Sequence, residues 1–177
     1  MLNKGLVYLG GGCFWCIESI FNQVNGVEEA ISGYMGGTKE TANYKDVCSG
    51  RTGHAEVVKV VFDKNVISFS EILEIFFYIH APTSLNRQGN DVGPQYRSII
   101  FFSSEYQLKV IENEISKIKI QSNNKIVTEV KSAIEFYQAE DYHMNYYNLN
   151  KNQPYCSLVI LPKISSFQKK FKKFTKA

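Results

Sequence analysis

The chain has 177 residues, of which 44% are hydrophobic and 21% are charged. This is enough for one hydrophobic core, and we expect a single catalytic domain over residues 1–177. The net charge is +3, but six of the 20 basic residues lie in the last fifteen positions. The rest of the chain has 14 basic and 17 acidic residues, and this acidic balance excludes a basic surface built for nucleic acid. No segment reaches the ~20 apolar residues of a membrane span or resembles a secretory signal, so we expect a cytoplasmic protein without membrane contact.

The predicted elements in the first half of the chain alternate between strands and helices. A short buried strand is expected at 6–9, and three glycines separate it from a helix over 13–24. Two more strands are expected at 29–37 and 54–63. Ser68 and Glu71 then form a capping box that predicts a helix ending near Pro82. The polar segment 83–95 has no periodicity and predicts a functional loop.

The second half of the chain continues the alternation. We predict strands at 98–102, 125–130 and 156–162, a long amphipathic helix marked by four apolar residues at helical spacing, and a short helix over 139–147. Those four residues are Leu108, Ile111, Ile115 and Ile118. The pattern predicts an α+β fold with a mixed sheet and packed helices over a core of about residues 5–162.

The lysine-rich tail, residues 163–177, carries three phenylalanines at helical spacing. Phe167, Phe171 and Phe174 fall at i, i+4 and i+7, so a helix would place them on one side and the lysines elsewhere. We predict a terminal helix that docks through its phenylalanines and leaves its lysines in solvent.

The four cysteines are Cys13, Cys16, Cys48 and Cys156. In a reducing compartment, thiols are better suited to catalysis or metal binding than to structural disulfides. A four-cysteine zinc site needs two close pairs, whereas Cys48 and Cys156 stand alone, so we expect no metal. The cysteines are therefore candidates for redox or nucleophilic chemistry.

Cys13 lies where the glycine-rich turn enters the first helix. Unpaired amide groups and the helix dipole favour a thiolate over a thiol at this position, which predicts an activated nucleophile. Phe14 and Trp15 could line an apolar, polarizable pocket suited to a methyl or thioether group, or they could simply anchor the helix in the core. The residue types alone leave both interpretations open.

Five blocks occur in the order in which they appear in one enzyme family. They are GCFWC at 12–16, SGYMGG at 32–37, the segment Y-x-x-V-C-S-G-x-T-G-H-A-E at 44–56, RQGNDVGPQYRS at 87–98 and AEDYH at 139–143. Over nearly the whole chain these blocks resemble the peptide methionine sulfoxide reductases of the A type. The resemblance implies a ferredoxin-like two-layer core. It also implies reduction of the S epimer of methionine sulfoxide, free and in oxidised proteins, through a sulfenic acid that is recycled by thioredoxin, with no bound cofactor.

The resemblance also assigns roles to individual residues. It matches Cys13 to the nucleophile and Phe14 and Trp15 to the cage around the substrate methyl group. Glu56 matches the proton donor to the sulfoxide oxygen, and burial of its carboxyl would raise its pKa from ~4.3 toward neutrality. Three further polar residues match groups that act on the same oxygen or line the loop beside it: Tyr44, Tyr96 and Asp91.

Two cysteines compete for the role of resolving residue. Cys16 is near Cys13 on the predicted helix, but a disulfide between them would strain the first turn. Cys156 matches the place where many family members carry a resolving cysteine, so we favour it and keep Cys16 as the alternative. The tail lacks the second recycling cysteine of some members, which excludes a relay through the tail.

Other functions explain only parts of the pattern. The alternative is a thioredoxin-like dithiol oxidoreductase that uses Cys13 and Cys16, and a Cys-His hydrolase is a weaker one. We expect His54 to support the site, and His80 and His143 to be structural. The chain departs from the family pattern at Ala81, Pro94 and Met144. None of these changes removes a group that the reaction requires, but Met144 leaves open how the AEDYH block is hydrogen-bonded. We expect a monomer.

Overall fold

A mixed six-stranded sheet forms the centre of the computed structural model, which describes residues 3–176. Its strand order is β7-β6-β1-β3-β2-β8, and every neighbouring pair is antiparallel except β6 and β7. The strands are β1 (Lys4–Gly10), β2 (Val27–Met35), β3 (Ala55–Asp63), β6 (Ile99–Phe102), β7 (Glu129–Ser132) and β8 (Tyr137–Gln138). A separate hairpin pairs β4 (Arg87–Gln88) with β5 (Asp91–Val92).

Two helices complete a β-α-β-β-α-β unit with these strands. They are α1 (Phe14–Phe21), between β1 and β2, and α3 (Phe69–Ile79), between β3 and β6. The four strands of this unit lie in the order β6-β1-β3-β2, which is the ferredoxin-like arrangement. The predicted α+β fold is therefore confirmed.

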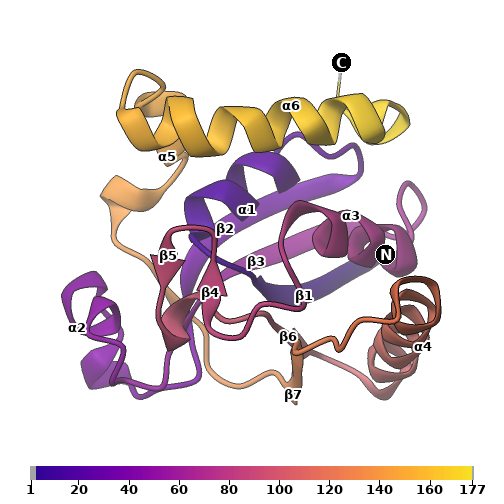
Figure 1. Cartoon of the computed structure of the whole chain (residues 1–177), viewed down its shortest axis with the longest axis horizontal. Coiled ribbons are helices and arrows are strands. Elements are labelled where there is room, and N and C mark those ends of the chain that lie inside the picture. The colour runs from indigo at the N-terminus through magenta and orange to yellow at the C-terminus, as the bar shows by residue number, and fades with distance from the viewer. Residues whose placement is uncertain (1–2, 177) are drawn as a thin grey trace.

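The remaining helices surround this unit, and Figure 1 shows α6 lying along α1. They are α2 (Tyr44–Cys48), α4 (Glu105–Ser122), α5 (Tyr146–Leu149) and α6 (Leu161–Lys170). Short 3₁₀ turns are η1 (Lys39–Thr41), η2 (Pro94–Tyr96), η3 (Asp141–His143) and η5 (Lys172–Phe174), and η4 (Cys156–Ile160) is a π-helix. Within residues 3–176, we find no helix with the length and hydrophobicity that crossing a membrane requires.

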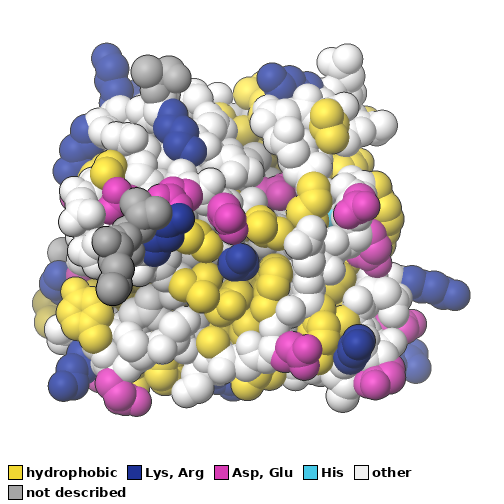
Figure 2. Space-filling model, turned by 180° about the vertical axis from the view of Figure 1, so that it is seen from behind, with side chains coloured by type: hydrophobic (Ala, Val, Ile, Leu, Met, Phe, Trp, Pro, Cys, Tyr) yellow, Lys and Arg dark blue, Asp and Glu magenta, His cyan; other side chains and the backbone are white. Residues whose placement is uncertain are grey.

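The main hydrophobic core lies between the sheet and the helices. Val58, Val60 and Phe62 alternate along β3 toward α1 and α3 and are fully buried. A smaller cluster on the opposite face of the sheet includes Val57 and Phe101. Figure 2 shows that side of the molecule, where hydrophobic side chains gather without a covering helix. The catalytic candidates described below lie on the helix-covered side.

The start of α3 follows the sequence prediction. Ser68 Oγ accepts a hydrogen bond from the Glu71 amide at 3.2 Å, and Glu71 Oε2 accepts one from the Ser68 amide at 2.9 Å. Ile67 before the N-cap and Ile72 in the helix are both buried, as in a hydrophobic staple. The capping box is confirmed.

The predicted strand over 156–162 is wrong. The chain there forms the π-helix η4, which continues directly into α6, with Pro162 in the first turn of α6. Ile160, Ile164 and Phe167 are all buried, and their spacing is that of a helix. The short apolar run shows this period only when it is joined to the tail, and a short apolar run alone fits a strand or a buried helix.

Two other predicted elements in the C-terminal part of the chain also have different boundaries in the structure. The strand predicted at 125–130 forms at Glu129–Ser132, and the helix predicted over 139–147 divides into η3 and α5. The docking of the tail is confirmed, because Phe167, Phe171 and Phe174 are buried at 0%, 3% and 8% exposure. The segment after residue 162 therefore packs on α1 and α3 as part of the fold.

Candidate active site

A glycine-rich turn places Cys13 at the start of α1. Cys13 is the N-cap residue, and Gly12 before it has a φ of +92°, which favours glycine. A Cβ atom on Gly12 would lie 2.9 Å from the Gln88 side chain, and one on Gly10 would lie 2.9 Å from the Glu56 carbonyl oxygen. The glycines therefore let this turn pack closely against β3 and β4.

The Glu56 side chain lies at the same helix N-terminus. It is 1% exposed, and its Oε2 accepts a hydrogen bond from the Phe14 amide at 3.0 Å. Burial raises the pKa of Glu56 to about 8, against the opposing effect of that amide. The expected shift is therefore present, and the carboxyl is largely protonated at neutral pH.

The Cys13 thiol is also buried, with 8% exposure. Burial is the largest effect and raises the pKa of Cys13, and the Trp15 amide at the helix N-terminus acts in the opposite direction. The predicted thiolate is not the resting form of Cys13, because loss of hydration outweighs the backbone hydrogen bond from Trp15. Cys13 rests as a thiol beside a protonated Glu56.

Phe14 and Trp15 differ in their surroundings. Phe14 is fully buried, and its ring centre lies 5.7 Å from that of Tyr34. Trp15 is only half-buried, and its indole stacks on Tyr146 at 3.7 Å with an angle of 6° between the planes. Its Nε1 donates to His143 Nδ1 at 3.0 Å. Phe14 thus belongs to the core as well as to the site region. The Trp15 indole is partly exposed, and its contacts with Tyr146 and His143 fix its orientation.

Tyr44 and Tyr96 come from α2 and η2, and both are affected by the charges of the site. The Tyr44 amide donates to Glu140 Oε1 at 2.8 Å, while Glu140 Oε2 accepts from the Tyr34 hydroxyl at 2.8 Å. Burial is the main cause that raises the pKa of Tyr44 and of Tyr96, and the charge of Glu56 adds to it in both cases. Both phenols remain protonated and can donate hydrogen bonds.

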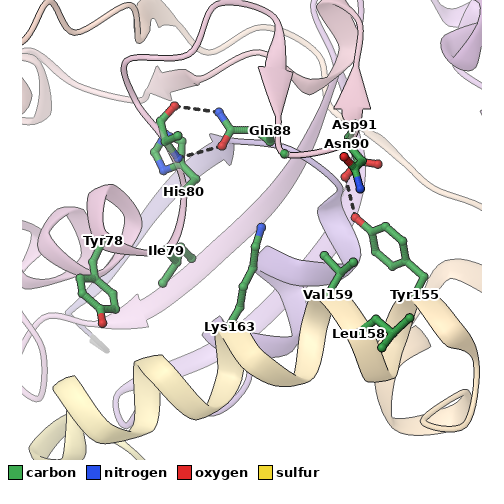
Figure 3. A pocket seen from close by; sticks show the side chains of 12 residues that line it. Tyr78, Ile79, His80, Gln88, Asn90, Asp91, Tyr155, Leu158, Val159 and Lys163 are labelled. Atoms are coloured by element: carbon green, nitrogen blue, oxygen red, sulfur yellow. Dashed lines mark hydrogen bonds between the residues drawn. The ribbon is translucent and has the colours of Figure 1, made fainter.

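Asp91 is positioned by the β4–β5 hairpin and by the segment that follows α5. Its Oδ2 accepts a hydrogen bond from the Tyr155 hydroxyl at 2.6 Å, as Figure 3 shows. The same hydroxyl lies 3.9 Å from Cys16 Sγ. A cavity of about 460 Å³ opens beside this pair and is also lined by Gln88 and Lys163. Tyr155 therefore links Asp91 to the Cys16 thiol.

Four residues of the site region were missed or underestimated at the level of sequence. Glu140 and His143 belong to the AEDYH block, which could have indicated them, whereas Tyr146 and Tyr155 carry no local signal. Burial lowers the pKa of His143, so the ring is neutral. Because its Nδ1 accepts from Trp15, the ring proton is on Nε2. His143, expected to be structural, thus orients Trp15.

The other two histidines stabilise the backbone around the site. His80 bonds through Nδ1 to the Phe76 carbonyl at 2.6 Å and through Nε2 to Ser98 at 2.7 Å. His54 Nδ1 accepts from the Gly37 amide at 3.1 Å, so it holds the turn after β2. At Ala81, where the chain departs from the family pattern, the backbone is fully hydrogen-bonded. Its N–H donates to Gln88 Oε1 and its C=O accepts from Gln88 Nε2, both at 2.8 Å.

All four cysteines are free thiols. Cys16 and Cys156 are buried, at 3% and 0% exposure, whereas Cys48 at the end of α2 is exposed. Among residues 3–176, no three His, Cys, Asp or Glu side chains are arranged to hold a metal ion.

Comparisons with known proteins identify the family. The family model described as "Peptide methionine sulfoxide reductase" matches residues 5–175. The peptide methionine sulfoxide reductase MsrA of Psychrobacter cryohalolentis is 50% identical over 168 residues, which are 95% of this chain and 96% of that protein.

Solved structures agree with this assignment. Mxr1 from Saccharomyces cerevisiae in reduced form matches with a TM-score of 0.80 and 33% identity over 87% of this chain and 90% of that one. Mxr1 in complex with Trx2, at 24% identity, shares the fold with a TM-score of 0.56 over 81% and 85% of the two chains. The family model and the half-identical relative cover nearly all of the chain, so this protein is an oxidoreductase that belongs to the peptide methionine sulfoxide reductase family, of the MsrA type.

Proposed function

We propose that the protein reduces the S epimer of methionine sulfoxide, free and in oxidised proteins, and that Cys13 becomes a sulfenic acid in the reaction. The observation that carries this proposal is the buried Glu56 carboxyl, whose pKa is raised to about 8, at the N-terminus of the helix that Cys13 caps. A sulfoxide oxygen leaves sulfur readily only after it has gained protons. A carboxyl that stays protonated at neutral pH can supply them.

The reaction transfers one oxygen atom from the substrate to Cys13. The Cys13 sulfur attacks the sulfoxide sulfur while Glu56 donates a proton to the oxygen. The sulfur–oxygen bond of the substrate breaks, methionine leaves, and the oxygen remains on Cys13 as S–OH. The thiol proton of Cys13 returns to Glu56, so the carboxyl ends in its starting state. Tyr44 and Tyr96 are proposed to donate to the same oxygen as charge develops on it.

Substrate selection is proposed to depend on Phe14 and Trp15. The methyl group of the sulfoxide packs against the two aromatic rings, since apolar and sulfur-containing groups pack well on such faces. The stacking of Trp15 on Tyr146 and its bond to His143 support this role, because they fix the orientation of the indole without covering it completely. Asp91 is proposed to act with the catalytic groups, as the polar partner of the Tyr44 and Tyr96 hydroxyls in the loop beside the site.

Recycling is proposed to pass through an intramolecular disulfide that thioredoxin reduces, with no bound cofactor. Cys156 is the proposed resolving residue and Cys16 is the alternative. The complex of yeast Mxr1 with Trx2 supports a partner of this kind for this chain. A sulfenic acid condenses with a nearby thiol to a disulfide, which is the form that a thioredoxin dithiol can reduce.

The first test uses the two epimers of methionine sulfoxide separately. The aromatic cage and the oxygen-binding groups fix two substituents of a chiral sulfur, so only one epimer presents its sulfur to Cys13. We expect single-turnover release of methionine to be ~10²-fold or more faster with the S epimer, because the R epimer leaves buried donors unpaired. Chromatography of released methionine measures both rates. Equal rates for the two epimers would rule out this arrangement.

The second test is the pH dependence of the sulfoxide step. The acid form of Glu56 is required, and it is the dominant form below its pKa of about 8. We expect the single-turnover rate to be nearly constant at neutral pH and to fall about tenfold per unit well above pH 8. Glu18, the one carboxyl of α1, provides a control, because burial raises its pKa to about 7. Glu18→Gln should leave the midpoint near 8, and a shifted midpoint would assign the titration to Glu18.

A further inference from the structure

A buried carboxyl on α1 lies near the aromatic wall of the site and has no part in the chemistry proposed above. Glu18 is 3% exposed and follows Trp15 by three residues, so the two side chains are neighbours on one face of α1. Its Oε1 accepts a hydrogen bond from the Asn145 amide at 3.3 Å. Building on the proposed function, we infer that Glu18 is a positioning residue for substrate selection: it holds the segment that carries Tyr146, which in turn fixes the Trp15 indole.

The link from Glu18 to Trp15 consists of two contacts with adjacent residues. The first is the hydrogen bond to the amide of Asn145, which directly precedes α5. The second is the stack of Tyr146, the first residue of α5, on Trp15, with ring centres 3.7 Å apart and 6° between the planes. Because the amide and the ring belong to neighbouring residues, a shift of the Asn145 backbone moves the Tyr146 ring. The position of the ring on the indole therefore depends on Glu18.

Packing alone holds α5 weakly. None of its four residues, all within the described part of the chain, is buried, and Leu149 at its end is 72% exposed. Asn145 before it has a φ of +52°, a left-handed conformation that is unfavourable for most residues with a side chain, although asparagine tolerates it better than most. Segments with few buried contacts open easily. A hydrogen bond from the rigid helix α1 is therefore important for the placement of this segment.

The burial of Glu18 supports a role beyond packing. A buried carboxyl costs free energy unless hydrogen bonds replace those that it made with water, and burial raises the pKa of Glu18 to about 7. The neighbouring positions of α1 are filled by buried apolar side chains, namely Ile17, Ile20 and Phe21. An apolar side chain at position 18 would fill the same space at a lower cost. What the carboxyl adds is an acceptor oxygen, which its ionised and its protonated form both provide.

The consequence of losing this anchor falls on substrate binding. Trp15 is held at its ring face by Tyr146 and at Nε1 by His143. Without the stack, the indole can turn about the bond to His143, and the methyl group of the sulfoxide loses a fixed wall. The link does not pass through Cys13 or Glu56, so the sulfoxide step of bound substrate should change little.

The test compares Glu18→Met with Glu18→Gln in the full chain. The two new side chains are similar in length, and only glutamine has an oxygen that can accept from the Asn145 amide. Single-turnover release of methionine, measured over a range of methionine S-sulfoxide concentrations, gives a limiting rate and the concentration for half the limiting rate. For Glu18→Met we expect this concentration to rise roughly three- to tenfold, the contribution of one aromatic contact, and the limiting rate to stay within about twofold.

Glu18→Gln should keep both wild-type values, because the hydrogen bond needs an acceptor and not a charge. A Glu18→Gln variant that behaves like Glu18→Met would overturn the proposal. If Glu18→Met does not fold, Glu18→Ala, which also lacks the acceptor, takes its place. Failure of the proposed function itself would be distinct, because the wild type would then release no methionine at any concentration.

Fluorescence reports the link directly. Trp15 is the only tryptophan of the chain, so its emission is sensitive to the stack on Tyr146. We expect the emission of Glu18→Met to shift to longer wavelength, because the indole becomes more exposed to water, and that of Glu18→Gln to match the wild type. Wild-type emission from folded Glu18→Met protein would contradict the inference.

A double-mutant cycle tests whether Glu18 acts through Tyr146. Tyr146→Ala removes the stacked ring and should raise the half-maximal concentration by a factor similar to that of Glu18→Met. Combining the two substitutions should raise it little further, since both remove the same link, whereas independent, additive effects would overturn the proposal.

Ser19→Ala is the matched control on the same helix. Ser19 is also buried, but its hydroxyl donates to the Cys16 carbonyl at 2.8 Å within α1. We expect wild-type kinetics and emission from this variant. A change as large as that of Glu18→Met would show that general distortion of α1 is sufficient, and the specific role of Glu18 would be refuted.

Discussion

Replacing Cys13 with serine is expected to abolish methionine sulfoxide reduction. The sulfur of Cys13 must accept the substrate oxygen as S–OH, and a serine oxygen has no comparable product. Loss of a nucleophile of this kind lowers rates by on the order of 10⁴-fold or more. Single-turnover release of methionine, measured with millimolar dithiothreitol present to remove any dependence on thioredoxin, reports the effect.

The fold of the Cys13→Ser variant should be intact, which makes the loss of activity interpretable. Cys13 is an N-cap residue, and serine is among the preferred residues at that position. We therefore expect a thermal unfolding midpoint close to that of the wild type, with Cys48→Ser as a matched exchange at an exposed thiol. Release of one methionine per enzyme by folded Cys13→Ser protein would show that oxygen goes elsewhere.

Replacing Glu56 with glutamine is expected to slow the sulfoxide step by ~10²-fold or more, the range of general acid catalysis. Glutamine keeps the shape of the side chain and an oxygen that can accept from the Phe14 amide, but it cannot supply a proton. The decline in rate above pH 8 should also disappear in the variant. The pH profile separates loss of an acid from a general distortion of the site, which would lower the rate and leave the decline in place.

The Glu56→Gln substitution is also expected to change how the free energy of unfolding depends on pH. The pKa of Glu56 is raised in the folded state to about 8, so between its unfolded value and pH 8 the folded protein binds more protons than the unfolded chain. Its contribution therefore lowers the free energy of unfolding as pH rises through this range. Glu56→Gln should flatten that decline, as denaturant titrations at pH 6 and pH 8 can measure. An unchanged decline would contradict a buried, protonated Glu56.

Several parts of the fold were predictable because their signals are local. The capping box of Ser68 and Glu71 involves groups three residues apart, and it forms as predicted. The turn from β1 into α1 depends on glycines beside Cys13, one of which has a positive φ. The spacing of Phe167, Phe171 and Phe174 similarly predicted that the tail docks through these rings, although α6 ends at Lys170 and Phe174 lies in η5. Backbone conformation and nearest-neighbour hydrogen bonds decide such features, and the sequence contains both.

The C-terminal segment shows where such reasoning failed. The apolar run after Cys156 is too short to reveal a period, and its role as a π-helix leading into α6 depends on burial against α1. The link between Tyr155 and Asp91 joins residues 64 positions apart, and the bond between Trp15 and His143 joins residues 128 positions apart. No local pattern predicts such pairs.

The sequence by itself determined the family, the βαββαβ core and the identity of Cys13, Phe14, Trp15 and Glu56 as candidates, because motifs and short-range periodicity encode them. Only the tertiary structure decided the protonation of the site. The dipole of α1 favours a Cys13 thiolate, but burial by distant segments removes water from both Cys13 and Glu56 and raises both pKa values. Desolvation depends on which side chains surround a group, and those neighbours come together only when the chain has folded.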